Sequence, residues 1–216
     1  MRLLVATTNP DKLREIRGLL GHLSVEVLSL RDFAPVPEPE EAGATFEENA
    51  HLKAHYYDAA ITQPAALAQC GPLLTVAEDS GLVVDALDGE PGVRSARFLR
   101  PDATYPERFA EIQRRLAGRA MAPRTARFVC AVAVVHAGAL VYETTGVVEG
   151  EIAQEARGTH GFGYDPIFYY PPYGRTLGET TEDEKVRVAH RGHAFRRLAE
   201  WLEKCRTENK GLFSVP

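Results

Sequence analysis

The sequence predicts an α/β fold built around a central mixed β-sheet. The chain opens with a strand–helix–strand pattern, its apolar segments indicate about as many strands as helices, and no internal repeat or clean linker divides it. A length of 216 residues is enough for one large domain or two small ones. We expect one α/β unit, and two lobes with a cleft between them would also agree with this pattern.

The first three elements are predicted from residues 2–30. Residues 2–6 form a short apolar run that ends in a polar turn, which predicts a buried strand. Pro10 suits the first turn of a helix, apolar residues then recur at helical spacing, and Gly21 can end that helix. Residues 24–30 alternate weakly between polar and apolar and predict a second strand.

A loop rich in proline and glutamate, residues 31–44, precedes the second helix. Thr45, followed three residues later by Glu48, is a capping-box signature that marks the start of this helix. An apolar stripe predicts that the helix continues to about Ile61, before a loop over residues 63–72.

The middle of the chain predicts an interrupted strand. An apolar strand over residues 73–77 stops at the polar residues 78–81, which we interpret as a turn, and a strand resumes over residues 82–87. Apolar residues at helical spacing then predict a helix around residues 109–116.

A hairpin, a loop and a helix follow. Residues 128–135 form a long β-type run that pairs, across a glycine turn, with residues 140–145. Residues 158–172, dense in glycine, proline and aromatic residues, predict a loop. The last helix starts near Gly192 and turns an apolar stripe toward the core. We expect a single domain over residues 1–206 and a frayed tail over residues 207–216.

Composition excludes several classes of protein. The net charge of −5 disfavours a general nucleic-acid binder, which usually carries a basic excess. Cys70, Cys130 and Cys205 form no CxxC motif, which disfavours a disulfide framework and a cysteine zinc site and indicates a cytoplasmic protein. The N-terminal apolar stretch is too short for a signal peptide, and no run approaches the ~18 apolar residues of a membrane span.

Small polar residues between the first strand and the first helix are candidates for binding an anion. The helix dipole and the free N–H groups at a helix start favour negative charge, and a lysine adds a formal positive charge. An ordinary helix cap is the alternative interpretation. The residues are Thr7, Thr8, Asn9, Pro10, Asp11 and Lys12.

Two adjacent acids, Glu78 and Asp79, interrupt the buried segment. Charges flanked by a buried strand are costly unless they are paired or bound to metal. Because neighbours on a strand point to opposite faces, we expect one acid to face a cleft and the other to lie elsewhere. With Glu40 and Glu41 of the acidic loop, they offer oxygen ligands for Mg²⁺, although a solvated acidic loop is the alternative for that segment.

A glycine-rich aromatic segment, GFGYDP, and cations near the last helix are candidates for recognising a base. Glycine lets the backbone approach a ligand closely, Phe162 can stack on a base, and Asp165 can accept a hydrogen bond from a ring N–H. Lys185 and Arg191 suit phosphates, and His190 can donate to a base carbonyl. A plain aromatic turn and a solvated basic helix start are the alternatives.

Six motifs, taken together and in their order along the chain, resemble those of the HAM1/inosine triphosphatase family, the pyrophosphatases for non-canonical purine nucleotides. The similarity runs from residue 3 to about residue 203. The motifs are TTNPDK at residues 7–12, TFEENA followed by Lys53-Ala54 at residues 45–54, EDSGL at 78–82, PGVRSAR at 91–97, GFGYDP at 161–166 and AHRG at 189–192.

The resemblance implies a fold, partners and an activity. The fold would be an elongated α/β structure of two lobes, with a central curved mixed sheet flanked by helices and a substrate cleft between the lobes. The protein would be a homodimer that depends on Mg²⁺. It would hydrolyse ITP, dITP and XTP to the monophosphate and pyrophosphate.

The resemblance also implies roles for the candidate residues. Residues 7–12 would hold the triphosphate, and Asp79 would be the catalytic acid–base residue and a metal ligand, with Glu40 or Glu41 expected as the second ligand. Ser80 and Lys185 would contact the substrate. The base pocket would consist of Phe162, Gly163, Tyr164, Asp165, His190 and Arg191.

Two departures from the family pattern leave these assignments in place. Ala189 replaces the usual serine before His-Arg, which removes a hydroxyl, and Glu78 stands where aspartate is commoner, which keeps the charge. Three other functions compete: a Maf-like pyrophosphatase acting on dTTP or UTP, a nucleotide sensor without catalysis, and a nucleic-acid-binding module. GFGYDP and HRG argue against the first, Asp79 and Lys12 against the second, and the net charge against the third.

Overall fold

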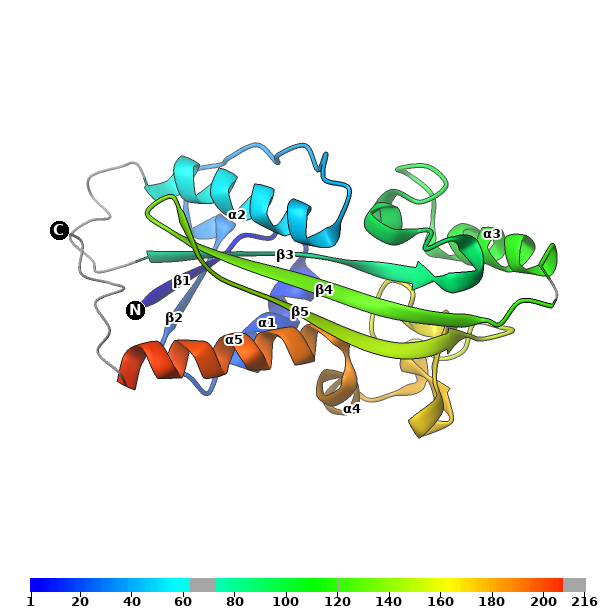
Figure 1. Cartoon of the computed structure of the whole chain (residues 1–216). Helices are drawn as coiled ribbons and strands as arrows, with labels where there is room; N and C mark the ends of the chain where they lie inside the picture. Colours follow the sequence, from blue (N-terminus) through cyan, green and yellow to red (C-terminus); the bar gives the residue numbers. More distant parts are fainter. Residues whose placement is uncertain (63–72, 120, 208–216) are drawn as a thin grey trace. The chain divides into compact units, whose positions relative to one another are not determined.

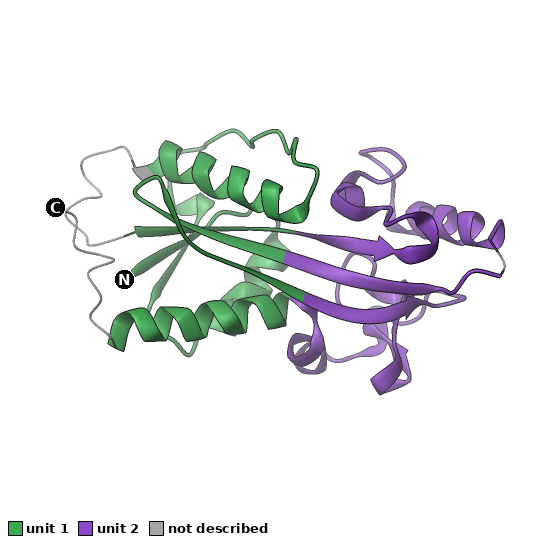
Figure 2. Cartoon of the chain, viewed as in Figure 1, with its two compact units in different colours: residues 1–79, 131–146, 191–216 green, residues 80–130, 147–190 purple. Residues whose placement is uncertain are grey.

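The computed structural model describes residues 1–62, 73–119 and 121–207. The chain divides into two compact units (Figure 2). Unit 1 comprises Met1–Asp79, Ala131–Gly146 and Arg191–Pro216, and unit 2 comprises Ser80–Cys130 and Val147–His190. The predicted loop at residues 63–72, with Cys70, and residues 208–216 of the predicted tail lie outside the described residues. Thr207, predicted as the first residue of that tail, is still helical. The single domain over residues 1–206 stays a prediction.

Among the described residues, the sheet has seven strands in the order β2-β1-β3-β4-β5-β6-β7. β1 runs parallel to both β2 and β3, whereas β6 runs antiparallel to β5 and β7, so the predicted mixed sheet is confirmed. The strands are β1 Arg2–Val5, β2 Glu26–Ser29, β3 Leu73–Val84, β4 Thr125–His136, β5 Ala139–Ile152, β6 Phe168–Tyr170 and β7 Arg175–Thr176.

The predicted helices form, with small changes at their ends. In unit 1, α2 lies on one side of the strands and α5 on the other (Figure 1). α4 and the short strands β6 and β7 were not predicted, because each is too short to show a clear apolar period. The helices are α1 Pro10–Leu20, α2 Phe46–Thr62, α3 Tyr105–Ala117, α4 Glu182–Val188 and α5 His190–Thr207.

The predicted turn at residues 78–81 is wrong, because β3 continues through it as one strand. The backbone stays extended because the charges of the two acids are paired on either side of the strand, which offsets the cost of their burial. Gly81 is needed there for close packing: a Cβ at this position would lie 2.4 Å from Ser95 Oγ. That hydroxyl oxygen accepts a hydrogen bond from the Leu82 N–H at 2.9 Å.

The predicted hairpin of β4 and β5 is confirmed. Its turn is Ala137-Gly138, both with positive φ (49° and 80°), as a two-residue hairpin turn requires. Each unit buries apolar residues of its own. In unit 2, Phe128, Phe168 and Ile112 belong to one buried cluster. Within the described ranges, no helix is both long and apolar enough to cross a membrane.

Candidate active site

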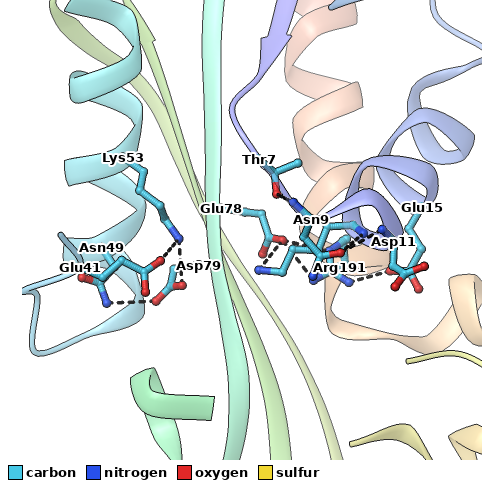
Figure 3. A network of polar contacts seen from close by, with 11 residues as sticks. Thr7, Asn9, Asp11, Glu15, Glu41, Asn49, Lys53, Glu78, Asp79 and Arg191 are labelled. Atoms are coloured by element: carbon cyan, nitrogen blue, oxygen red, sulfur yellow. Dashed lines mark hydrogen bonds and ion pairs between the residues drawn. The ribbon is translucent and has the colours of Figure 1, made fainter. Parts of the chain in front are cut away.

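Glu78 and Asp79 point to opposite sides of β3, as strand alternation predicts (Figure 3). Both side chains belong to unit 1 and are almost fully buried. On one side Asp79 meets residues of α2 and of the acidic loop, and on the other Glu78 meets α1 and α5. The two neighbouring acids therefore have separate sets of partners.

Asp79 is held by two residues of α2. Lys53 places its Nζ 3.0 Å from Oδ1 of Asp79, and Asn49 donates from Nδ2 to Oδ2 at 3.1 Å. Asn49 and Lys53 are four residues apart, so they lie on one face of the helix. Burial raises the pKa of Asp79 above its ordinary value, although Lys53 acts in the opposite direction. A raised pKa makes the ionised carboxylate a better proton acceptor.

The sequence did not decide between Glu40 and Glu41 as the second candidate metal ligand, and the structure places them differently. Glu41 is half-buried and accepts from Lys53 Nζ at 2.8 Å, whereas Glu40 is exposed. Asn49 fastens the loop, because its Oδ1 accepts from the Gly43 N–H at 2.8 Å. Glu41 and Asp79 are thus brought to the same ammonium group (Figure 3).

This pair of carboxylates fits a magnesium ion. Carboxylates are hard oxygen ligands, and Mg²⁺ takes one or two of them together with phosphate oxygens and water. Glu41 and Asp79 already converge on one cation, Lys53 Nζ. In the part of the chain that the structure describes, no group of three or more His, Cys, Asp or Glu side chains could hold a metal ion.

On the other side of β3, Glu78 belongs to a buried charge network. Its Oε1 lies 3.0 Å from Lys12 Nζ and 3.1 Å from one Arg191 nitrogen, and Arg191 also contacts Glu15 Oε2 at 2.6 Å. Burial alone would raise the pKa of Glu78, but Arg191 and Lys12 hold it well below its ordinary value. Glu78 is therefore an ionised counter-charge.

The segment predicted to hold the triphosphate caps α1. Asn9 Oδ1 accepts from the N–H groups of Asp11 and Lys12, at 2.9 and 3.2 Å, and the Asn9 N–H donates to Thr7 Oγ1. The ordinary helix cap is thus present, and Asn9 already binds two of the N–H groups at the helix start. Thr7 and Thr8, with Pro10, also line a cavity of about 660 Å³ in unit 1.

A second cluster of predicted residues lies in unit 2. Asp165 Oδ2 is 2.7 Å from Lys185 Nζ, both side chains are at most 4% exposed, and the ammonium lies 4.3 Å from the centre of the Phe162 ring. The same oxygen accepts from the Phe162 N–H at 2.8 Å. Gly161 has φ of +72°, and a Cβ there would lie 2.2 Å from Asp165 Oδ2, so glycine allows this close approach.

Other predicted base-pocket residues in unit 2 pack firmly. Tyr164 donates from its hydroxyl to the Ser95 carbonyl at 2.9 Å, and burial raises its pKa. His190 stacks on Phe128, with ring centres 4.9 Å apart and an angle of 21° between the planes. Gly163 has φ of +66° and, like Ser80, is half-buried.

Arg191 lies in a different setting from the one predicted. Its guanidinium contacts Glu15 and Glu78, and all three residues belong to unit 1. The roles of the site residues toward a substrate stay predictions.

Sequence reasoning assigned no role to Asn49, Lys53 or Glu15. The first two lie within the quoted helix motif, where their four-residue spacing indicates a shared face. Glu15 follows Lys12 by three residues and offered a weaker signal of the same kind. Their partners could not be predicted, because Asp79 and Arg191 lie far along the chain.

Several known proteins are similar to this chain in sequence. A family model described as the Ham1 family matches residues 3–201. The "dITP/XTP pyrophosphatase" of Exiguobacterium sibiricum is 42% identical, covering 92% of this chain and 95% of that protein, and that of Geobacillus kaustophilus is 42% identical over 94% of each.

Two solved structures are also similar. A HAM1 protein from Coxiella burnetii has a TM-score of 0.83 and 37% identity, covering 94% of this chain and 99% of that one. A "Nucleoside-triphosphatase / dITP/XTP pyrophosphatase" from Mycobacterium abscessus has a TM-score of 0.70 and 39% identity, with the same coverage. With the family model spanning nearly the whole chain, the protein belongs to the Ham1 family.

Proposed function

We propose that this protein hydrolyses the non-canonical purine nucleotides ITP, dITP and XTP to the monophosphate and pyrophosphate. One observation carries the proposal: a buried carboxylate, Asp79, shares the ammonium group of Lys53 with a second carboxylate, Glu41. The relatives named "dITP/XTP pyrophosphatase", which match nearly the whole chain, support dITP and XTP as substrates.

Asp79 and Glu41 would hold Mg²⁺, with Glu40 too exposed to be preferred. When bound, the ion neutralises phosphate charge and polarises a phosphoryl oxygen. Lys12 adds positive charge for the triphosphate, since its side chain is 18% exposed and can leave Glu78 for a phosphate oxygen.

In the reaction, water attacks the α-phosphorus, a P–O bond forms, and the bond to the bridging oxygen breaks as pyrophosphate leaves. Asp79 accepts a proton of the attacking water through its carboxylate. Its raised pKa favours this role, and Lys53 keeps it ionised while Asn49 fixes its orientation.

Base choice would depend on the residues of unit 2. Phe162 supplies an aromatic face for stacking, and Asp165, whose charge Lys185 offsets, can accept from a ring N–H. His190 would donate to the 6-oxo group of hypoxanthine or xanthine. Adenine has an amine there, which leaves the buried donor unpaired and disfavours ATP.

We further propose that the enzyme is cytoplasmic and a homodimer, with neither nucleic acid nor membrane as a partner. The net charge of −5 supports the absence of a nucleic-acid partner, and the lack of a CxxC motif supports the cytoplasm. The homodimer is what the resemblance to the family implies.

A panel of nucleotides with Mg²⁺, scored by kcat/KM with detection of pyrophosphate, tests the proposal. We expect kcat/KM for ITP, dITP and XTP to exceed that for ATP. Preference for dTTP or UTP would identify a Maf-like pyrophosphatase instead, and binding without pyrophosphate release would identify a sensor.

A further inference from the structure

We infer that Glu15 is a positioning residue for the triphosphate-binding lysine, Lys12, and acts on it through Arg191 and Glu78. This inference rests on the proposed function, because it concerns how the same site prepares to bind a triphosphate. Glu15 itself would not touch the substrate.

The contacts form a continuous chain of alternating charge within unit 1. Glu15 Oε2 binds one terminal nitrogen of Arg191 at 2.6 Å, while Arg191 Nε and its other terminal nitrogen lie 3.3 and 3.1 Å from Glu78 Oε1. Lys12 Nζ reaches that same Glu78 oxygen at 3.0 Å. Two cations and two anions therefore balance, and α1, β3 and α5 each contribute (Figure 3).

Of the four charged side chains in this network, Lys12 is exposed enough to exchange its partner for a phosphate, and the other three are buried. The side chains of Arg191, Glu78 and Glu15 are 2%, 2% and 5% exposed, whereas that of Lys12 is 18% exposed. When Lys12 turns toward a phosphate, Glu78 keeps Arg191 as its counter-charge. No buried carboxylate is then left unpaired, which would otherwise oppose binding.

Glu15 makes this arrangement rigid. It holds one end of the guanidinium, so that the other end meets Glu78 without displacing Lys12 from the shared oxygen. Without its charge, Arg191 would turn toward Glu78 and compete with Lys12. The lysine would then have to be ordered by the substrate, and a site that is not preorganised binds more weakly.

A double-mutant cycle with ITP tests the inference. We expect Glu15→Gln to raise KM about tenfold and to change kcat less than about threefold, the effect of weakening one charged contact. In a Lys12→Ala background, the same change should raise KM less than about twofold, because the group that Glu15 positions is gone. Equal effects in the two backgrounds would overturn the inference, since a purely structural role is additive.

Glu111→Gln is the matched control. Glu111 also binds arginines, Arg114 and Arg115, but lies in unit 2, and we expect no change of KM in either background. A rise in KM as large as that of Glu15→Gln would refute the specific role of Glu15.

Glu15→Asp covers the case in which Glu15→Gln does not fold. It keeps the charge on a shorter side chain, and its smaller effect on KM should likewise disappear with Lys12→Ala; persistence of the effect would refute the inference. If the wild type releases no pyrophosphate from ITP, the proposed function itself fails and the inference with it. An active wild type with an additive cycle refutes the inference alone.

Discussion

Replacing Asp79 and Glu78, the two neighbouring acids of β3, one at a time should affect catalysis in the first case and stability in the second. Asp79→Asn keeps the shape of the side chain and one acceptor oxygen, but removes the proposed base and the proposed metal ligand. Loss of a general base typically lowers the rate by ~10²–10⁴-fold. We therefore expect kcat for ITP to fall by at least about 100-fold.

The folded state should tolerate Asp79→Asn. Burial raises the pKa of Asp79 above its unfolded value, so stability associated with this group is present at low pH and is lost as pH rises through the folded pKa. At neutral pH the ionised carboxylate therefore gives no net stabilisation that the substitution would remove. The melting temperature without metal should be no lower than that of the wild type.

Glu78→Gln should behave in the opposite way. Its carboxylate, 2% exposed, balances Arg191 and Lys12, and removing one partner from a buried ion pair costs about 3–5 kcal/mol. For a chain of this size, that lowers the melting temperature by on the order of 10 °C. For stability, the buried network therefore makes Glu78→Gln the more damaging of the two changes.

Pyrophosphate release from ITP with Mg²⁺ and thermal unfolding without metal measure the two effects. Turnover by Asp79→Asn equal to that of the wild type would refute the mechanism. A loss of kcat in Glu78→Gln with an unchanged melting temperature, while Asp79→Asn stays active, would mean that Glu78 is the catalytic acid.

Three further changes test the site. Glu41→Gln should raise the Mg²⁺ concentration needed for half-maximal activity by about tenfold or more, as loss of a charged contact predicts. Glu40→Gln, at an exposed position, should leave that concentration unchanged. A magnesium titration in which both variants behave alike would contradict the assignment. Lys53→Met removes a group that lowers the pKa of Asp79, so the acidic limb of the pH profile of kcat/KM should move to higher pH, and an unmoved limb would exclude this role. His190→Ala should lower kcat/KM for ITP more than for ATP, and an equal decline would show that His190 does not select the base.

Much of the fold follows from short-range rules that the sequence carries. The start of α1 is specified by Asn9 and Pro10, and the apolar period predicts the helix that follows. The start of α2 follows equally from Thr45, whose hydroxyl oxygen accepts from the Glu48 N–H. The alternation of side chains along a strand was enough to predict that Glu78 and Asp79 point in opposite directions.

The partners of those acids depended on the tertiary structure. Glu78 and Arg191 are 113 residues apart, and Asn49 and Asp79 are 30 apart. Local pattern extends over a few residues and carries no information about such pairs. For the same reason, residues 78–81 read as a turn in the sequence although β3 continues through them. The partners that offset the cost of burying the two charges are in place only in the folded chain.

The choice between Glu40 and Glu41 likewise depended on the tertiary structure and not on the sequence. Both are adjacent acids in a loop, so they have equal claims by residue type and spacing. Composition and motif order were enough to predict the family, the mixed sheet and the catalytic carboxylate as a candidate. Which loop acid meets Lys53, and which buried charges hold Lys12, depended on segments distant in sequence packing together, because pairing of buried charge is a property of the folded chain.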